Sequence, residues 1–253
     1  MKATVLRVLE QFVAEPRPCS YLEGRSASLE YRVMTGVSAE ELERLLERGW
    51  RRFGLAYFRP ACRACTECVP LRVPVSTFVQ SRSQRRVLAK GAGFRMRMDA
   101  PGVDDARMNL YHRWHAGRSE RRGWDDDGMT PERYFHEFAF PHPAAREITW
   151  FDGDKLIAVS LVDETPRALS AVYTYHDPDY ERFSLGTLSV LTQIEIARRS
   201  GKNCVYLGYR VLGCASSQYK ARYLPHEVLR AMPATTAAPE WTRVDTDPLA
   251  GRV

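Results

Sequence analysis

The sequence predicts a mixed α/β fold whose central unit is a strand, a helix and a second strand parallel to the first. The run Leu169–Tyr175 is rich in aromatic and β-branched residues, which is typical of a strand. The run Cys204–Leu207 is short and wholly apolar, as expected of a strand buried on both faces. Between these runs, apolar residues recur at helical spacing: Leu185, Leu188, Leu191, Ile194 and Ala197. A right-handed crossover would place the two strands side by side.

Local signals set the limits of this helix. His176-Asp177-Pro178-Asp179 has turn chemistry that ends the first strand, and Ser184 is expected to cap the helix. Arg198, Arg199 and Gly201 supply its C-terminal stop. A helix N-terminus that faces strand ends is a place where anions and acyl groups can bind.

Composition sets the class of protein. The chain has 253 residues, of which 44% are hydrophobic and 27% charged, so one large domain or two small ones can each bury a core. No apolar run reaches membrane-spanning length, and the residues after Met1 do not read as a signal segment. We therefore expect a cytoplasmic protein without a membrane partner.

The net charge is +6, which makes a polyanionic partner plausible. One segment, Ser76–Met98, carries six basic residues and no acid: Arg82, Arg85, Arg86, Lys90, Arg95 and Arg97. A run of cations without acids suits a phosphate backbone, because binding there releases counterions. The alternative is an ordinary solvated face, the commoner fate of a charge run. We favour contact with RNA.

In the N-terminal part, Ser38-Ala-Glu-Glu41 forms a capping box, so a helix should run to about Arg48 and stop at Gly49. A second helix is expected over Ser81–Leu88. The expected strands are Glu30–Met34, Trp50–Phe58 with Arg51 and Arg52 on it, Leu71–Val75 and Phe94–Met98.

Further along, the sequence predicts a helix over Asp104–Arg118, a loop over Gly123–Gly128 and a helix from Thr130-Pro131 to about Phe138. Asp152-Gly-Asp154 is a strong hairpin signal between strands at Glu147–Phe151 and Leu156–Val162. We divide the chain into an N-terminal portion (1–100), a C-terminal domain (101–232) and a tail (233–253) that we expect to be poorly ordered.

Three cysteines crowd one loop with the spacing of metal ligands. They are Cys62, Cys65 and Cys68, and Cys19 could be a fourth ligand for zinc or an iron–sulfur cluster. The alternative, which we rate slightly ahead, is a set of reduced structural thiols. Either reading suits a reducing compartment.

Several motifs carry a family resemblance. In the C-terminal half they are the nine residues from Ser170 to Pro178, Ser184-Leu-Gly-Thr187, Tyr206-Leu-Gly-Tyr209 and Tyr219-Lys220; in the N-terminal half they are Trp50-Arg-Arg52, Tyr57-Phe-Arg-Pro60 and Ser81-Arg-Ser-Gln-Arg-Arg86. In these motifs the chain resembles the aminoacyl-tRNA–protein transferases. That family includes eukaryotic arginyltransferases and bacterial leucyltransferases, which act on proteins with N-terminal Asp or Glu and mark them for degradation.

The resemblance implies a fold, a reaction and partners. The C-terminal half should have a fold like that of the acetyltransferases (GNAT), joined to a smaller N-terminal α/β portion. The reaction should transfer an amino acid from aminoacyl-tRNA to a protein N-terminus, without a cofactor for the chemistry. We expect leucine as the donated residue, with arginine as the alternative.

Polar groups at the strand ends are the candidate catalytic residues: Tyr173, Asp177, Tyr206, Tyr209 and Lys220. Asp177 could orient the incoming α-amine or accept its proton, or be only a turn residue. Tyr206 could be a core-edge aromatic, and Lys220 could steady the tRNA end. The candidate tRNA-binding residues are Arg51, Arg52, Arg82, Arg85, Arg86, Ser184, Gly186 and Gly208.

The chain also departs from the family pattern. Leu22 replaces the partner of Cys19 in a Cys-x-x-Cys pair, and Arg210 stands where an aromatic residue is usual. A pyrophosphate loop for coenzyme A needs several glycines, and only Gly186 is present, so an N-acetyltransferase is the less favoured alternative. A non-catalytic RNA- or metal-binding module is a further one. Three helical histidines lack matching partners in the sequence: His112, His115 and His136.

Overall fold

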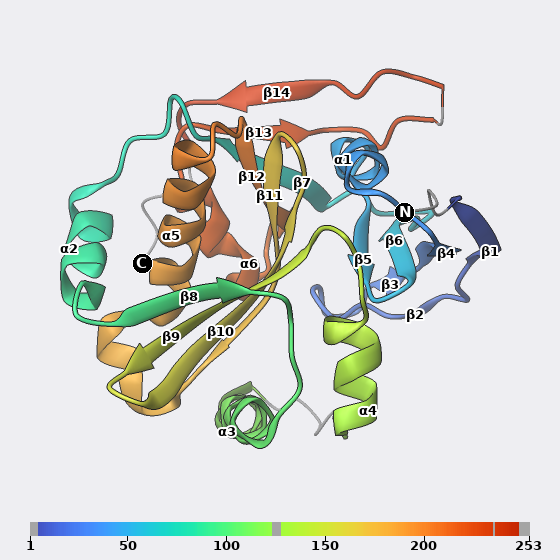
Figure 1. Ribbon diagram of the computed structural model, residues 1–253. Helices are drawn as coiled ribbons and strands as arrows, with labels where there is room; N and C mark the ends of the chain where they lie inside the picture. Colours follow the sequence, from blue (N-terminus) through green and yellow to red (C-terminus); the bar gives the residue numbers. More distant parts are fainter. Residues whose placement is uncertain (1–4, 123–127, 235, 248–253) are drawn as a thin grey trace.

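The computed structural model describes residues 5–122, 128–234 and 236–247, and it has a mixed α/β fold. Its largest element is an eight-stranded sheet with the order β14-β13-β7-β12-β11-β10-β9-β8. In Figure 1 this sheet occupies the centre of the molecule, with α5 and α2 at one end and a smaller sheet at the other. Among the described residues, no helix is both long enough and apolar enough to cross a lipid bilayer.

The strands of the large sheet come from both halves of the chain. Their bounds are β7 (Cys68–Pro74), β8 (Arg95–Asp99), β9 (Ala145–Asp152), β10 (Lys155–Glu164), β11 (Ala168–His176), β12 (Cys204–Val211), β13 (His226–Leu229) and β14 (Trp241–Val244). Strand β7 pairs with β12 on one side and β13 on the other. The N-terminal portion therefore supplies an interior strand, so the two predicted portions interlock.

The smaller sheet has the order β1-β4-β6-β5 and is wholly antiparallel. Its strands are β1 (Arg7–Val13), β4 (Leu29–Thr35), β6 (Ala56–Pro60) and β5 (Arg51–Phe53), and a two-residue ladder, β2 (Arg17–Pro18) with β3 (Ser26–Ala27), lies in the connection from β1 to β4. The sequence predicted one strand over Trp50–Phe58, and that prediction is wrong. The chain turns back at Gly54, whose φ of 52° is in the left-handed region that glycine tolerates.

The helices follow their sequence signals closely. They are α1 (Ala39–Glu47), α2 (Arg82–Gly91), α3 (Asp105–Arg122), α4 (Pro131–Tyr134) with its π-helical extension Phe135–Ala139, α5 (Leu185–Arg199) and α6 (Ala215–Gln218), with short 3₁₀ turns at Pro178–Phe183 and Tyr219–Arg222. Both capping boxes are present, at Ser38 with Glu41 and at Ser81 with Gln84. Ser184 precedes α5 at a φ of 53° and makes no side-chain cap, contrary to expectation. Of the predicted loop Gly123–Gly128, all but Gly128 lies outside the described residues.

Helix α5 lies on the large sheet through the apolar face predicted from its spacing. Leu191, Ile194 and Ala197 are buried with Leu169 of β11 and Val205 of β12 in one core cluster. Since the helix connects these two strands, its burial holds them parallel.

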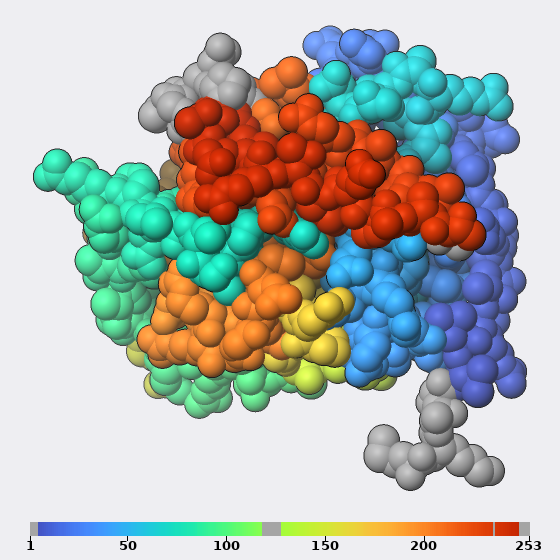
Figure 2. Space-filling model, turned by 90° about the horizontal axis from the view of Figure 1, so that it is seen from above, coloured from blue at the N-terminus to red at the C-terminus, as the bar shows by residue number. Residues whose placement is uncertain are grey.

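The C-terminal tail is ordered over most of its described length, so the expectation of a poorly ordered tail is wrong there. Residues Trp241–Val244 form β14, and the indole of Trp241 donates a hydrogen bond to the carbonyl of Glu47. Arg48 donates to two tail carbonyls, those of Ala234 and Ala237. Figure 2 shows the C-terminal residues, in red, spread across the surface seen from above.

We predict that Gly54→Ala destabilises the protein by at least about 3 kcal/mol, measured as the free energy of unfolding in denaturant. A Cβ at this position would lie 2.0 Å from the carbonyl oxygen of His136, at a φ that L-residues rarely adopt. Gly153→Ala is the matched control, because its φ is 58° and nothing lies within 4 Å of the added Cβ. It should cost about 1–2 kcal/mol. Equal losses in the two variants would show that the β5–β6 turn does not depend on this contact.

Candidate functional site

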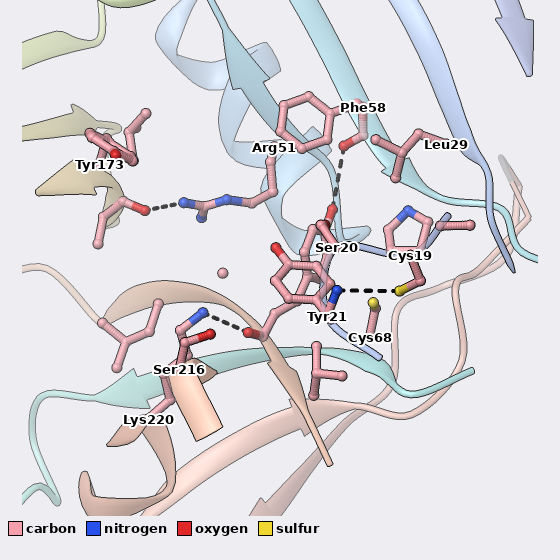
Figure 3. A pocket seen from close by; sticks show the side chains of 18 of the residues that line it. Cys19, Ser20, Tyr21, Leu29, Arg51, Phe58, Cys68, Tyr173, Ser216 and Lys220 are labelled. Carbon is pink, nitrogen blue, oxygen red and sulfur yellow. Dashed lines mark hydrogen bonds between the residues drawn. The ribbon is translucent and has the colours of Figure 1, made fainter. Parts of the chain in front are cut away.

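A cavity of about 1000 Å³ lies between the two sheets. One wall is the smaller sheet, with Leu29, Tyr31, Arg51 and Phe58 facing inward. The opposite wall is built from β11, β12, the first turn of α5 and the segment Ala215–Lys220. Figure 3 shows Arg51, Tyr173, Tyr21 and Lys220 around this space.

The cavity exists because β11 and β12 separate. They pair for only three residue pairs, from Ala168 with Cys204 to Ser170 with Tyr206. Beyond Ser170, each strand keeps its other neighbour, β10 or β7, and the gap between them is open. A split in a parallel sheet leaves main-chain groups without ladder partners, and these groups need other hydrogen bonds.

Arg51 supplies one such bond and a second one to a side chain. Its guanidinium donates to the Ser170 hydroxyl at 2.7 Å and to the Ala171 carbonyl. Strand β5 is thereby fixed to β11 at the point where β11 leaves β12. Burial lowers the pKa of Arg51 from its ordinary value, so this cation stands in a poorly solvated place.

Lys220 lies beside Arg51. Its Nζ donates to the Tyr209 carbonyl at 2.6 Å. Both cations close on Gly208, where an added Cβ would lie 3.6 Å from the lysine Nζ and 3.8 Å from the arginine Cζ. Gly208 has a φ of 77° at a bulge in β12, so a glycine fits both the backbone and the close approach. Burial, and then the charge of Arg51, lower the pKa of Lys220 to about 7.

Tyr173 also lines the cavity, as predicted. Its hydroxyl shares a hydrogen bond of 2.8 Å with Nε2 of His115, and its ring stacks on Phe138 with centroids 5.3 Å apart. The sequence left His115 without a partner, and that reading is wrong. The partner lies 58 residues away, so no local pattern could reveal it.

Tyr209 lines the cavity but directs its hydroxyl away from it. The hydroxyl donates to the Gly49 carbonyl at 2.7 Å, which joins β12 to the turn between α1 and β5. Burial raises the pKa of this hydroxyl, so it is not a source of protons at neutral pH. Its contribution is to hold the strand that carries Arg51.

Two of the candidate catalytic residues lie outside the cavity lining. Asp177 is fully buried, and its carboxylate accepts bonds of 2.9 Å from Arg113 and Lys155. Burial alone would raise the pKa of Asp177, but hydrogen bonding, first from Lys155, lowers it. Tyr206 packs on Trp241, and its hydroxyl accepts from Arg72 at 3.3 Å. Both side chains therefore bond to neighbouring residues within the fold and do not line the cavity.

Some of the predicted tRNA-binding residues line the cavity and others do not. Gly186 lines the cavity at the first turn of α5, and nothing lies within 4 Å of the place where its Cβ would be. The open space shows that helix–strand packing does not require a glycine here. Ser184 does not line the cavity. Arg52 also lines it but is buried in an ion pair with Asp163, and the α2 arginines are exposed and lie outside the lining. Their contact with tRNA stays a prediction.

Arg210 does not face the cavity either. Its guanidinium pairs with Asp247 at 3.1 Å. It therefore adds no charge to the cavity lining.

The four candidate metal ligands, Cys19, Cys62, Cys65 and Cys68, all contribute to the cavity lining as free thiols. Two of their sulfurs accept main-chain bonds of 3.4 Å, Cys19 from Tyr21 and Cys62 from Ser28. Burial, then the neighbouring thiols, raise the pKa of Cys68 to about 12. Across the described ranges, no three His, Cys, Asp or Glu side chains are arranged to hold a metal ion, and metal binding here stays a prediction.

We predict that Asp177→Asn lowers stability rather than the rate of the reaction. The variant replaces a carboxylate that accepts from two cations with a neutral amide that keeps only one acceptor oxygen, at a cost of about 1–3 kcal/mol at pH 7. A lowered folded-state pKa stabilises the protein above the unfolded pKa of about 3.9, and this contribution is lost as pH falls through the folded value. The difference between variant and wild type in chemical denaturation should therefore shrink in acid.

Asp179→Asn is the control, since Asp179 also pairs with Arg113 but is exposed. Asp179→Asn should lower the stability less than Asp177→Asn does. If Asp177→Asn instead showed a large loss of kcat and unchanged stability, the prediction would be wrong and the Asp177 carboxylate would take part in the reaction.

We further predict that Lys220 titrates near pH 7. The rate of trace acetylation at Lys220 is measured by mass spectrometry across a pH series. The half-point, the pH at which this rate reaches half of its maximum, should be about 7. Lys155 is the internal reference, because its hydrogen bond to Asp177 raises its pKa. Arg51→Gln should move the Lys220 half-point upward, since it removes a neighbouring positive charge. A half-point near the ordinary lysine value of about 10.4 in the wild type would contradict this environment.

Comparison with known proteins extends over nearly the whole chain. Residues 17–86 match the family described as "Arginine-tRNA-protein transferase, N terminus", and residues 106–230 match its C terminus. The chain is 35% identical over 234 residues to an aspartate/glutamate leucyltransferase of Helicobacter hepaticus, which covers 92% of this chain and 97% of that protein. It is 37% identical to a protein of the same name from Chromobacterium violaceum, covering 86% and 90%.

Similarity to solved structures is more distant. The chain is 10% identical to FemX over 67% of its length and 59% of that chain, with a TM-score of 0.44. It is 13% identical to L-PGS from Bacillus licheniformis over 69% of its own length and 51% of that chain, with a TM-score of 0.43.

Proposed function

The chain belongs to the arginine-tRNA-protein transferase family, and we propose that it transfers leucine from leucyl-tRNA to the N-terminus of proteins that begin with aspartate or glutamate. The relatives named aspartate/glutamate leucyltransferase support the substrates. The observation that carries the proposal is the pair of half-buried cations, Arg51 and Lys220, that line the cavity and meet at Gly208, beside the split between β11 and β12.

The cation pair suits an acidic acceptor residue. A carboxylate that enters the cavity gains two charge-assisted partners in a place of low dielectric. Its negative charge raises the pKa of Lys220 and keeps the lysine protonated. A neutral amide of the same shape would leave both cations without a counter-charge.

The same pair bears on the donated amino acid. Much of the lining is apolar, with Val172, Val190 and Leu207 close to the split strands, and this suits a leucyl side chain. An arginyl side chain would bring a third positive charge beside Arg51 and Lys220. The geometry therefore favours leucine over arginine.

The reaction is aminolysis of an ester. The α-amine nitrogen of the acceptor attacks the leucyl carbonyl carbon, the new C–N bond forms, and the bond to the tRNA ribose oxygen breaks. The amine loses a proton and the ribose oxygen gains one. An α-amine has a pKa of about 7.7–8.0, so a part of it is already neutral at pH 7 and little base strength is needed.

The side chains around the cavity supply position and polarity. Holding amine and ester together can contribute up to about 7–11 kcal/mol when the geometry is ideal. In this proposal the Tyr173 hydroxyl donates to the oxyanion that forms on the leucyl carbonyl, while Nε2 of His115 donates to the tyrosyl oxygen. The first turn of α5, open at Gly186, adds a positive main-chain potential on the same side.

We predict that purified protein adds leucine from leucyl-tRNA to peptides that begin with Asp or Glu. Peptides that begin with Asn or Gln should have kcat/KM lower by about 5- to 150-fold, the equivalent of about 1–3 kcal/mol for an unpaired buried charge. Extension is measured by mass spectrometry with peptides that differ only in residue one.

Arginyl-tRNA and acetyl-coenzyme A serve as competing donors in the same assay. Arginine transfer in place of leucine transfer would overturn the donor but keep the family. Acetylation without transfer from either tRNA would falsify the proposed function.

A further inference from the structure

One row of side chains crosses the whole smaller sheet and ends at Arg51. Phe12 of β1 lies opposite Tyr31 of β4, Tyr31 lies opposite Phe58 of β6, and Phe58 lies opposite Arg51 of β5. Directly opposed residues share a face of a sheet, so all four side chains stand on the cavity side. The ring centroids are 5.3 Å apart from Phe12 to Tyr31 and 6.0 Å from Tyr31 to Phe58.

The row leads from solvent to the reacting centre. Tyr31 and Phe58 line the cavity, and Phe12 lies beyond its lining on the edge strand, with 41% of its surface exposed. All seven residues of β1 are exposed. Because a phenylalanine on an edge strand adds little to a core, the position of Phe12 in line with the cavity rings is better explained by a ligand than by packing.

We propose that this row, Phe12, Tyr31 and Phe58, binds the unpaired 3′-terminal nucleotides of the tRNA and guides the aminoacyl ester to Arg51 and Lys220. The inference rests on the proposed function and extends it by giving the donor a path. Bases stack on aromatic side chains without regard to sequence, because every base has a π-face. A tRNA 3′ end is single-stranded, so its bases are free to stack.

A peptide would not use this surface in the same way. Extended peptides bind sheets through main-chain hydrogen bonds at an edge. The row runs across the sheet rather than along an edge: its middle residues lie on the interior strands β4 and β6, and only its two ends, Phe12 and Arg51, lie on the edge strands β1 and β5. What the row offers is therefore ring faces rather than main-chain donors and acceptors, and ring faces favour bases.

Basic residues lie at both ends of the molecule. Arg17 is exposed and lines the same cavity as Tyr31 and Phe58, so it offers a positive charge to a phosphate there. Helix α2 with its arginines lies at the opposite end of the molecule from β1 (Figure 1). The row thus provides a contact for the 3′ end that is separate from α2.

The test uses short RNA hairpins that carry or lack unpaired nucleotides at the 3′ end, bound to the full chain and followed by fluorescence anisotropy. Phe12→Leu removes the ring but keeps an apolar side chain, and it should weaken binding of the intact hairpin by about fivefold or more. Binding of the trimmed hairpin should change little. Phe12→Tyr keeps the ring and should bind as the wild type does.

Val13→Ala is the matched control on the same strand. Val13 lies opposite Glu30, on the other face of the sheet, and is also exposed. It should bind both hairpins as the wild type does. Circular dichroism checks that all variants keep the fold.

Transfer kinetics separate this inference from the proposed function. Phe12→Leu should raise KM for leucyl-tRNA and leave KM for the peptide unchanged. If the wild type transfers no leucine but the intact hairpin still depends on the Phe12 ring, the proposed function fails and the row remains an RNA site. If Phe12→Leu binds the intact hairpin as tightly as the wild type, or raises only KM for the peptide, the row does not hold the 3′ end.

Discussion

The functional architecture depends on the separation of two parallel strands, β11 and β12, after three residue pairs. The separation opens a space inside the large sheet and leaves main-chain groups that need partners. Arg51 reaches across from the smaller sheet to bond Ser170 and Ala171 at this point. One side chain thus bonds a carbonyl next to the point where the ladder ends, joins the two sheets and places a cation on the cavity lining.

The two halves of the chain build this centre together. The N-terminal half supplies Arg51 through the β5–β6 hairpin, and it also supplies β7 to the middle of the large sheet. The C-terminal half supplies Lys220, Tyr173 and the first turn of α5. Neither half encloses the cavity alone, which explains why both family segments occur in one chain.

The cation pair has a cost that the reaction can use. Burial lowers the pKa of Arg51 and of Lys220 near Gly208, and the positive charge of Arg51 lowers the pKa of Lys220 further. An entering carboxylate relieves that cost. In the proposed reaction, this gain on binding contributes to the selectivity for an acidic acceptor, and the lower stability of the free protein is a frequent compromise at active sites.

Sequence reasoning succeeded where signals are local. The helical spacing of α5, the capping box at Ser38 and the hairpin at Gly153 are confirmed, because each depends on residues a few positions apart. Motif residues also converged, since Arg51, Gly208 and Lys220 meet at one point. Asp177 and Tyr206 lie away from this point. A motif identifies a residue at the end of a strand, but it does not tell to which face of the sheet the side chain points. His115, β1 and β13 depend on partners distant in sequence, and no short pattern announces them.

The most direct test of the account is a crystal structure with a non-reactive donor, an adenosine that carries leucine through a 3′-amide. The account predicts that the leucyl carbonyl lies within hydrogen-bond distance of the Tyr173 hydroxyl, with the α-carbon between that residue and the Arg51–Lys220 pair. Binding outside the split between β11 and β12, with no contact to Tyr173, Arg51 or Lys220, would contradict it.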